Sequence, residues 1–471
     1  MIRQLAAAVR ERRVGAHELV SESLRRIETC DPELNAVVAL RAEEALDEAR
    51  GLDERLASGG GEPRPLAGVP ALIKDLTDVT GMRTTFGSQL YAHAAPAARD
   101  GLPTARLRAA GAVIVGKTNT PEFATEGYTN NHVFGPTRNP WNRERTPGGS
   151  SGGSGAAVAA GMAPIATATD TSGSIRIPAT YCGLVGLKPT NGIVAREPET
   201  RTTLEWIDLT TDGPLGATVD DVVLQLEVLA GPAPGDPTAL PWVWHHEQAG
   251  SRRPRRLFVA ERWAPEWGAL PDEARALLDE AAEKMAMLMR LEPEPIDAAA
   301  GLGEIGSVDD DSYLITAVEL LQALGGAERF ARVKDELFPA TVELVELALD
   351  TGADAYVAAR RRRLAYTRWF DELLGDDAIV LGAVMATDAI AAEGPSGGAG
   401  STGDAYLTAP HNLTGNPALS LPAGRYPSGM PFGLQVTGPR FGDDLLLDIA
   451  ATWEEAHPWH LAAEGYEPFG V

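Results

Sequence analysis

Hydrophobic positions along this chain follow two spacings, one typical of helices and one typical of buried strands. Apolar residues three and four positions apart predict amphipathic helices, over residues 2–29 (two helices separated near Gly15), 40–57, 103–110, 213–231, 271–290, 312–325, 337–350, 354–375 and 443–455. Short apolar runs predict buried strands near 69, 112, 165, 256, 378, 418 and 432. Helices and strands alternate throughout, which indicates an α/β fold: one large, twisted mixed β-sheet covered on both faces by α-helices. No repeat or clear linker divides the chain, so we expect a single domain over residues 1–471.

One stretch departs from both spacings. Residues 146–190 are crowded with Gly, Ser and Ala, and only Asp170, Arg176 and Lys188 carry charge there. Such a composition is common in flexible linkers. The apolar residues within it argue for a buried segment instead, in which small residues let backbones approach closely and leave N–H groups free to face a ligand. We therefore expect a site here, with Ser150, Ser151 and Ser174 as candidate hydroxyls.

Charge and cysteine content narrow the functional classes. The 471 residues carry a formal net charge of −25, which disfavours a nucleic-acid partner because phosphate binding requires a basic surface. The two cysteines are too few for a disulfide framework, and Cys182 lies in an apolar run typical of a core residue. No segment is long enough to span a membrane and no signal peptide begins the chain, so we expect no membrane partner and a cytoplasmic location.

Lys74, at the end of the apolar run 69–73, has two interpretations. A lysine at a strand end most often extends its ammonium to solvent. A buried lysine instead has a lowered pKa and can act as a general base. Competing motifs are weak: GGSSGGSG lacks the Lys-Ser/Thr ending of a phosphate-binding loop, and no histidine motif follows that would complete a Ser-His-Asp triad. His132 is more typical of a surface or structural position, and the arginine run 360–363 is more typical of a solvated helix face with acidic partners.

The combination of Lys74 with two serines resembles the amidase signature family. The resemblance rests on GGSSGG at 148–153, on D-x-G-S-I-R-x-P-A at 170–179, and on GVPALIKD around Lys74. It extends to GKTNTPEFA at 116–124, FGPTRNPW at 134–141, GLVGLKPT at 183–190 and NLTGNPALSLPAG near the C-terminus. It implies a catalytic core over about 60–232 and 406–455, and a variable region over about 235–405 that shapes the substrate pocket.

The family's catalytic residues transfer to three positions. Ser174 resembles the nucleophile, Ser150 the serine that bridges nucleophile and base, and Lys74 the base. The family places its bridging serine after a cis peptide bond, so we expect Gly149–Ser150 to be cis. Neutral Lys74 would accept a proton from Ser150 while Ser150 accepts one from Ser174.

Supporting roles follow from the same resemblance and from the local chemistry. The backbone N–H groups of Thr171, Ser172, Gly173 and Ser174 are the expected oxyanion hole. Ser151 is expected to support the site by hydrogen bonding, and Asp170 with Arg176 to form a structural charge pair. Ser172 departs from the family, in which many members have glycine at this position. We therefore expect Ser172 to affect substrate specificity.

The predicted function is hydrolysis of a carboxylic-acid amide to the acid plus ammonia or an amine, without a metal or other cofactor. We expect a small-molecule amide as the partner. The sequence leaves open whether the chain forms a homodimer. One alternative is the glutaminase component of a tRNA-dependent amidotransferase complex, which uses the same chemistry on glutamine. Another is a non-catalytic binding protein on this fold, which the presence of Lys74, Ser150 and Ser174 disfavours.

Overall fold

The computed structural model describes residues 1–60, 64–196, 209–241, 253–263, 268–395 and 407–470. Its largest sheet has seven strands in the order β10-β9-β11-β13-β12-β6-β8. Strand β9 pairs in parallel with β10 and β11, and the other neighbours pair antiparallel. The strands of this sheet are β6 (Val185–Lys188), β8 (Leu215–Gly216), β9 (Arg256–Ala260), β10 (Pro293–Ile296), β11 (Ala378–Ala383), β12 (Ala418–Arg425) and β13 (Pro431–Thr437).

A second sheet carries Lys74. Its order is β1-β3-β2-β4, formed by β1 (Val37–Leu40), β2 (Pro70–Lys74), β3 (Val113–Thr118) and β4 (Ile165–Ala166). A two-stranded ribbon pairs β5 (Ala168–Asp170) with β7 (Thr211–Gly213). The expected mixed α/β architecture is confirmed, and its hydrogen-bonded strands divide into these three sheets because β4, β5, β7 and β8 are only two or three residues long.

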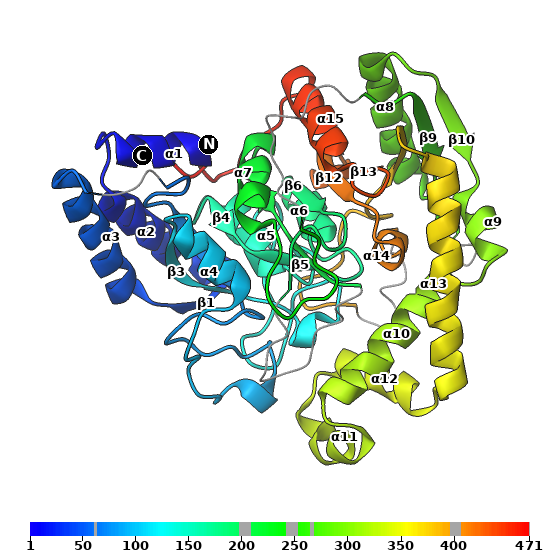
Figure 1. Cartoon of the computed structure of the whole chain (residues 1–471), viewed down its shortest axis with the longest axis horizontal. Helices are drawn as coiled ribbons and strands as arrows, with labels where there is room; N and C mark the ends of the chain where they lie inside the picture. The colour runs from blue at the N-terminus through cyan, green and yellow to red at the C-terminus, as the bar shows by residue number, and fades with distance from the viewer. Residues whose placement is uncertain (61–63, 197–208, 242–252, 264–267, 396–406, 471) are drawn as a thin grey trace.

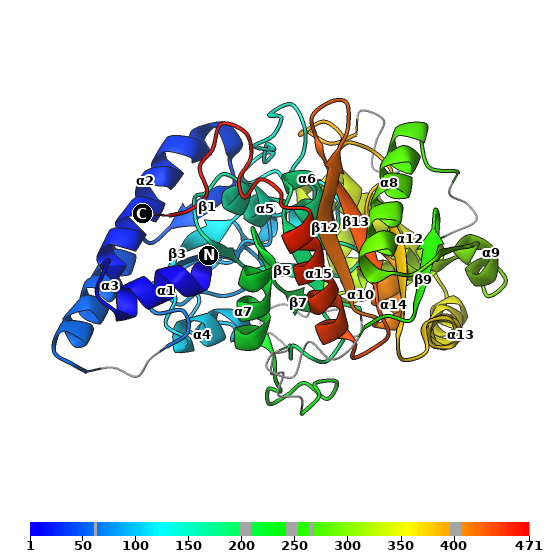
Figure 2. The same ribbon diagram turned by 90° about the horizontal axis from the view of Figure 1, so that it is seen from above.

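The helices lie around both sheets (Figures 1 and 2). On one side of the molecule are α1 (Ile2–Arg10), α2 (Ala16–Leu34), α3 (Ala42–Ala57) and α4 (Leu102–Ala109). On the opposite side are α8 (Asp272–Met289), α9 (Ala298–Gly303), α10 (Val308–Ala323), α11 (Ala327–Val333), α12 (Pro339–Leu349) and α13 (Ala353–Leu374). Between them lie α5 (Gly152–Ala159), α6 (Arg176–Cys182), α7 (Val219–Leu229), α14 (Pro410–Thr414) and α15 (Asp443–Ala456).

The Gly/Ser/Ala stretch forms the buried centre of the molecule, which excludes the linker interpretation. Every residue of α5 and every residue of α6 is buried. Small side chains on α5 allow this close packing, because a helix of glycine, alanine and serine occupies little space beyond its backbone. The loops on either side of α5 are thereby held close to the end of β2.

The helix predicted over residues 213–231 is wrong in its first part. Residues 211–213 and 215–216 form β7 and β8, and α7 begins only at Val219. Two glycines and Pro214 disfavour helix here, and the Thr218 side chain caps α7 by accepting a hydrogen bond from the Asp221 N–H at 3.2 Å.

The arginine run of α13 faces acidic partners, as the sequence predicted. Arg362 pairs with Asp311 of α10, with its Nε 2.8 Å from Oδ2. Arg360 pairs with Glu319 of α10 at 3.2 Å. These ion pairs fasten α13 to α10, and α10 also lines the pocket described below.

Candidate active site

Lys74 ends β2, and all five residues of this strand are buried. Its ammonium position is surrounded by hydroxyl groups rather than by solvent. Nζ lies 2.7 Å from Ser150 Oγ, 2.9 Å from Ser151 Oγ and 2.9 Å from Thr169 Oγ1. The interpretation of Lys74 as a solvent-exposed strand end is therefore wrong, because its exposed fraction is 0%.

Burial lowers the pKa of Lys74 well below its usual 10.5, although Asp212 and Asp170 act in the opposite direction. The three hydroxyl contacts are compatible with a neutral amine. A neutral amine has two N–H donors and one lone pair, so one of its three hydroxyl neighbours donates its proton to nitrogen. Ser151 Oγ lies 3.3 Å from the carbonyl oxygen of Thr169 and can donate to it. This leaves Ser150 or Thr169 to donate to Lys74.

The two serines next to Lys74 stand at the entry to α5. The Gly149–Ser150 peptide bond is cis, as expected. Gly149 has no space for a side chain, because a Cβ there would lie 2.4 Å from the carbonyl oxygen of Glu126. The Ser151 N–H donates to the carbonyl oxygen of Ser174 at 3.3 Å, which joins the two serine-bearing loops.

Asp170 and Arg176 hold the loop that carries Ser174. They form an ion pair at 2.9 Å with both side chains at 0% exposure. Asp170 also accepts the N–H of Gly173 at 2.7 Å and the N–H of Ile175 at 3.2 Å. Arg176 in turn donates to Asn412 Oδ1 at 2.7 Å, which ties the loop to α14. The charge pair therefore organises the backbone on both sides of Ser174.

One member of the expected oxyanion hole is already hydrogen-bonded. The Gly173 N–H is directed to Asp170 Oδ1, so it is not available to an oxyanion in this structure. Gly173 instead has a conformational role: its φ is +135°, and a Cβ there would lie 2.2 Å from Thr408 Oγ1. Thr171, Ser172 and Ser174 remain as the candidate donors, and these three residues line the adjacent pocket.

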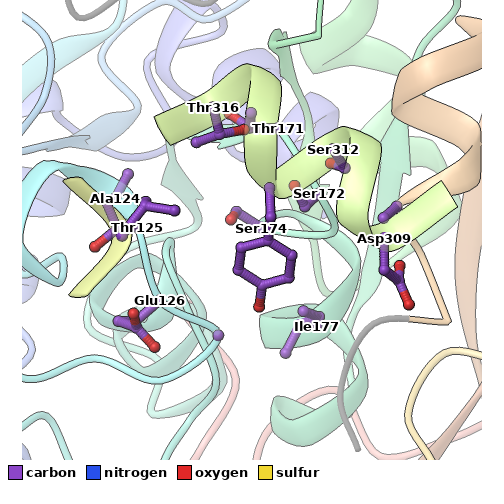
Figure 3. A pocket seen from close by; sticks show the side chains of 14 residues that line it. Ala124, Thr125, Glu126, Thr171, Ser172, Ser174, Ile177, Asp309, Ser312 and Thr316 are labelled. Atoms are coloured by element: carbon purple, nitrogen blue, oxygen red, sulfur yellow. The ribbon is translucent and has the colours of Figure 1, made fainter. Parts of the chain in front are cut away.

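A pocket that is partly open to solvent adjoins Ser174. Figure 3 shows its labelled side chains arranged around Ser174. We call it the Ser174 pocket. Its lining comprises Ala124, Thr125, Glu126, Gly127, Thr171, Ser172, Ser174, Ile177, Asp309, Ser312, Tyr313, Thr316, Leu344 and Ala409. Five of these residues belong to α10 and α12, within the region where the sequence carries no recognisable motif.

Other residues singled out in the sequence lie outside this arrangement. His132 is exposed and packs against Phe338 with the two rings tilted and their centroids 4.9 Å apart. Cys182 is buried, and desolvation raises the pKa of its thiol.

Among the residues that sequence reasoning missed, Thr169 and Glu126 are the most informative. Their only signal was proximity in sequence to recognised motifs, which does not reveal where a side chain points.

Comparison with known proteins identifies the class to which this fold and site belong. A family model described as Amidase matches residues 18–447, so the chain belongs to the amidase family. It is 33% identical over 467 residues to an acylamidase of Rhodococcus erythropolis, covering 97% of this chain and 95% of that protein. It is 34% identical over 502 residues to a glutamyl-tRNA(Gln) amidotransferase subunit of Geobacter metallireducens, covering 98% of each.

The structural comparison agrees with the sequence comparison. The crystal structure of a bacterial aryl acylamidase of the amidase signature family matches with a TM-score of 0.85 and 28% identity, covering 96% of this chain and 95% of that one. The resemblance drawn from the motifs is thereby confirmed, as is the α/β fold. The chain is an enzyme that hydrolyses amide C–N bonds.

Proposed function

We propose that this enzyme cleaves a carboxylic-acid amide through an acyl-enzyme on Ser174, with Ser150 and Lys74 as the proton relay. The observation that carries the proposal is the 2.7 Å contact between Lys74 Nζ and Ser150 Oγ in a fully buried setting. A serine hydroxyl is a weak nucleophile until a base removes its proton. Burial lowers the pKa of Lys74, which favours the neutral amine and lets it act as such a base.

The relay acts in two halves. Ser174 Oγ attacks the amide carbonyl carbon, its proton passes to Ser150 Oγ, and the Ser150 proton passes to the lone pair of Lys74. The relay then returns a proton to the amide nitrogen, the C–N bond breaks, and ammonia or an amine leaves. Water attacks the Ser174 ester, delivers a proton to the relay, and releases the acid with Ser174 restored.

The negative charge on the carbonyl oxygen requires fixed donors. The N–H groups of Thr171, Ser172 and Ser174 are the ones we assign to it, and each such donor typically contributes about 2.7–4 kcal/mol to transition-state stabilisation. Ser151 and Thr169 position Lys74 through their hydroxyls. Asp170 and Arg176 act on the loop and do not exchange protons with substrate.

The substrate is a small-molecule amide whose variable part occupies the Ser174 pocket. The helices α10 and α12 contribute Asp309, Ser312, Tyr313, Thr316 and Leu344 to that pocket, which supports assigning selectivity to the region over about 235–405.

A cytoplasmic location and a homodimer remain predictions. Within the described residues, no helix is long and apolar enough to cross a membrane.

The amidotransferase alternative is weakened by charge. Glutamine carries an α-carboxylate beside its α-ammonium group, and the carboxylate needs a cationic partner when it is removed from water. Among the described residues that line the Ser174 pocket, two are carboxylic acids and none is Lys, Arg or His. We therefore expect simple amides to be hydrolysed faster than glutamine.

An active-site-directed fluorophosphonate tests the assignment directly. The reagent should add one phosphonyl group to Ser174, located by peptide mass spectrometry. Lys74→Ala should react far more slowly, and Ser174→Ala should take up no label. Labelling of another serine in the native enzyme, or equal labelling rates with and without Lys74, would contradict the relay.

A further inference from the structure

Glu126 is a buried carboxyl group that the relay does not use. It lines the Ser174 pocket, and its exposed fraction is 8%. Its Oε2 is buried and has no hydrogen-bond partner. An ionised carboxylate left unpaired away from water is costly, which favours the protonated form of Glu126 unless a cation in the pocket pairs with the carboxyl group.

The position of Glu126 connects it to the reacting serines. Its backbone carbonyl packs against Gly149, where even a Cβ would lie 2.4 Å from the oxygen. In Figure 3, Glu126 and Asp309 appear on opposite sides of Ser174. Both acidic residues line the same pocket as Ser174.

The charge of this surrounding has one sign. The lining contains two carboxyl groups, of Glu126 and Asp309, and no Lys, Arg or His among its described residues, so any charge it carries is negative. Glu343 on α12 adds further negative charge near Glu126. Carboxyl groups that are ionised here would repel a carboxylate-bearing substrate and would pair with an ammonium group.

We propose that Glu126 determines specificity, and that the Ser174 pocket takes amides bearing a primary ammonium group, which Glu126 pairs with. This inference rests on the proposed function, because it concerns which amide reaches Ser174. The substrate class is then an ω-amino carboxylic amide, in which a chain of a few methylene groups separates the ammonium group from the scissile carbonyl.

The pocket gives this selectivity a pH dependence. Desolvation, with a further contribution from Glu343, raises the pKa of Glu126 to about 8. Glu343 from α12 is the charged group that acts on Glu126. Asp309 from α10 is the other carboxyl group of the pocket lining, and Glu122 precedes Glu126 in the chain. Glu126 is therefore mostly protonated below that pH and ionised above it. An alkyl ammonium, with a pKa of about 10.4, keeps its charge through this range.

The test compares ω-amino amides of three to six carbons with the corresponding unsubstituted amides. Their kcat/KM ratio removes the titration of Lys74, because both substrates use the same relay. In the native enzyme the ratio should favour the best amino amide by about 10- to 100-fold above pH 8, the range of one charge-assisted hydrogen bond. It should fall as the pH is lowered through about 8.

Two variants at this position make the test specific. In Glu126→Gln the ratio should fall to near one and lose its pH dependence. Glu126→Asp should keep a preference, shifted to an amino amide one methylene longer. The control Glu336→Gln removes one charge from an exposed residue outside the pocket lining and should keep the native ratio. Unchanged fluorophosphonate labelling of Ser174 in each variant shows that the relay is intact.

The outcomes separate the two proposals. A native ratio near one across the series, with both amides hydrolysed, overturns the role of Glu126 and leaves the amidase mechanism standing. A preference that survives in Glu126→Gln overturns it as well. Absence of hydrolysis together with absence of Ser174 labelling overturns the proposed function itself.

Discussion

Lys74 is the residue on which the chemistry of this enzyme depends. Three hydroxyl oxygens surround its nitrogen within 2.9 Å, and none of them carries a formal charge. Such neighbours accept and donate hydrogen bonds without stabilising the ammonium form as a carboxylate would. The arrangement therefore keeps the amine available as a proton acceptor.

Replacement of Lys74 by methionine should reduce kcat for a small amide by about 10²–10⁴-fold, the range for loss of a general base. Methionine has a similar length but no basic nitrogen, so Ser150 would have no proton acceptor. Steady-state assays against Lys284→Met, a surface control on α8, should isolate this effect. If the two variants retained equal turnover, Lys74 would not be the base.

The same substitution should alter the pH dependence of stability. The pKa of Lys74 is lowered in the folded state, so between that value and 10.5 the unfolded chain binds a proton that the folded chain does not. The free energy of unfolding contributed by this group rises with pH across that window. Native protein should therefore gain stability relative to Lys74→Met as the pH rises toward 10.5.

Urea unfolding at several pH values measures that difference. Parallel stability curves for the native protein and Lys74→Met would mean that Lys74 titrates normally in the folded state. A native protein that loses stability relative to Lys74→Met as the pH rises would have the opposite sign from the prediction and would exclude a depressed pKa.

Sequence reasoning located Lys74, Ser150 and Ser174 because they belong to motifs. It missed Thr169 and Glu126 because a side chain's direction depends on backbone pairing far along the chain. Thr169 belongs to β5, which pairs with β7 some 40 residues later. The availability of the Gly173 N–H was unpredictable for a related reason, because its partner is a side-chain oxygen of Asp170.

At the scale of elements, the loop between β5 and α6 depends on one buried charge pair. Burial alone would raise the pKa of Asp170, but Arg176 holds it well below its usual range. The carboxylate in turn fixes two backbone N–H groups, at Gly173 and Ile175. Removal of the arginine leaves that charge buried and uncompensated.

Arg176→Met should lower the free energy of unfolding by about 3–5 kcal/mol, as for other broken buried pairs. Chemical denaturation checks this value. Adding Asp170→Asn to the same chain should recover part of the loss, since asparagine is neutral and still accepts the N–H of Gly173. A double variant less stable than Arg176→Met would contradict the charge explanation.

The longer elements were predictable because their apolar spacing repeats over several turns. The helix expected over 354–375 is α13 at 353–374, and the strand expected at 377–384 is β11 at 378–383. The division of strands among three sheets was not predictable, because strands of two or three residues leave no pattern. The boundary between β8 and α7 could not be predicted from the sequence, because an apolar run follows it directly.

At the scale of the whole molecule, the net charge of −25 opposes compaction. Salt screens this repulsion over a Debye length of about 10 Å at 0.1 M. The melting temperature should therefore rise by about 2–4 °C between low-salt buffer and about 0.5 M NaCl. Differential scanning calorimetry with NaCl and KCl should give the same result, and a fall in both salts would show that attractive ion pairs dominate.

Both ends of the chain meet on one side of the molecule (Figure 1). Arg26 of α2 donates to the carbonyl oxygens of Glu467 at 2.9 Å and Pro468 at 3.0 Å. Residue Ile2 donates its N–H to Asp221 of α7 at 2.7 Å. The first and last segments are thus fastened to the same body that carries the site.

The contact between Gly149 and the backbone of Glu126 bears on how this enzyme can be redesigned. The backbone carbonyl of Glu126 lies against Gly149, the residue before the relay serine, and Glu126 also lines the pocket. Libraries that vary the side chain at position 126 should therefore yield new substrate ranges with turnover preserved. Libraries that change the length of the segment 124–128 should yield inactive clones, because any shift of that segment moves the relay.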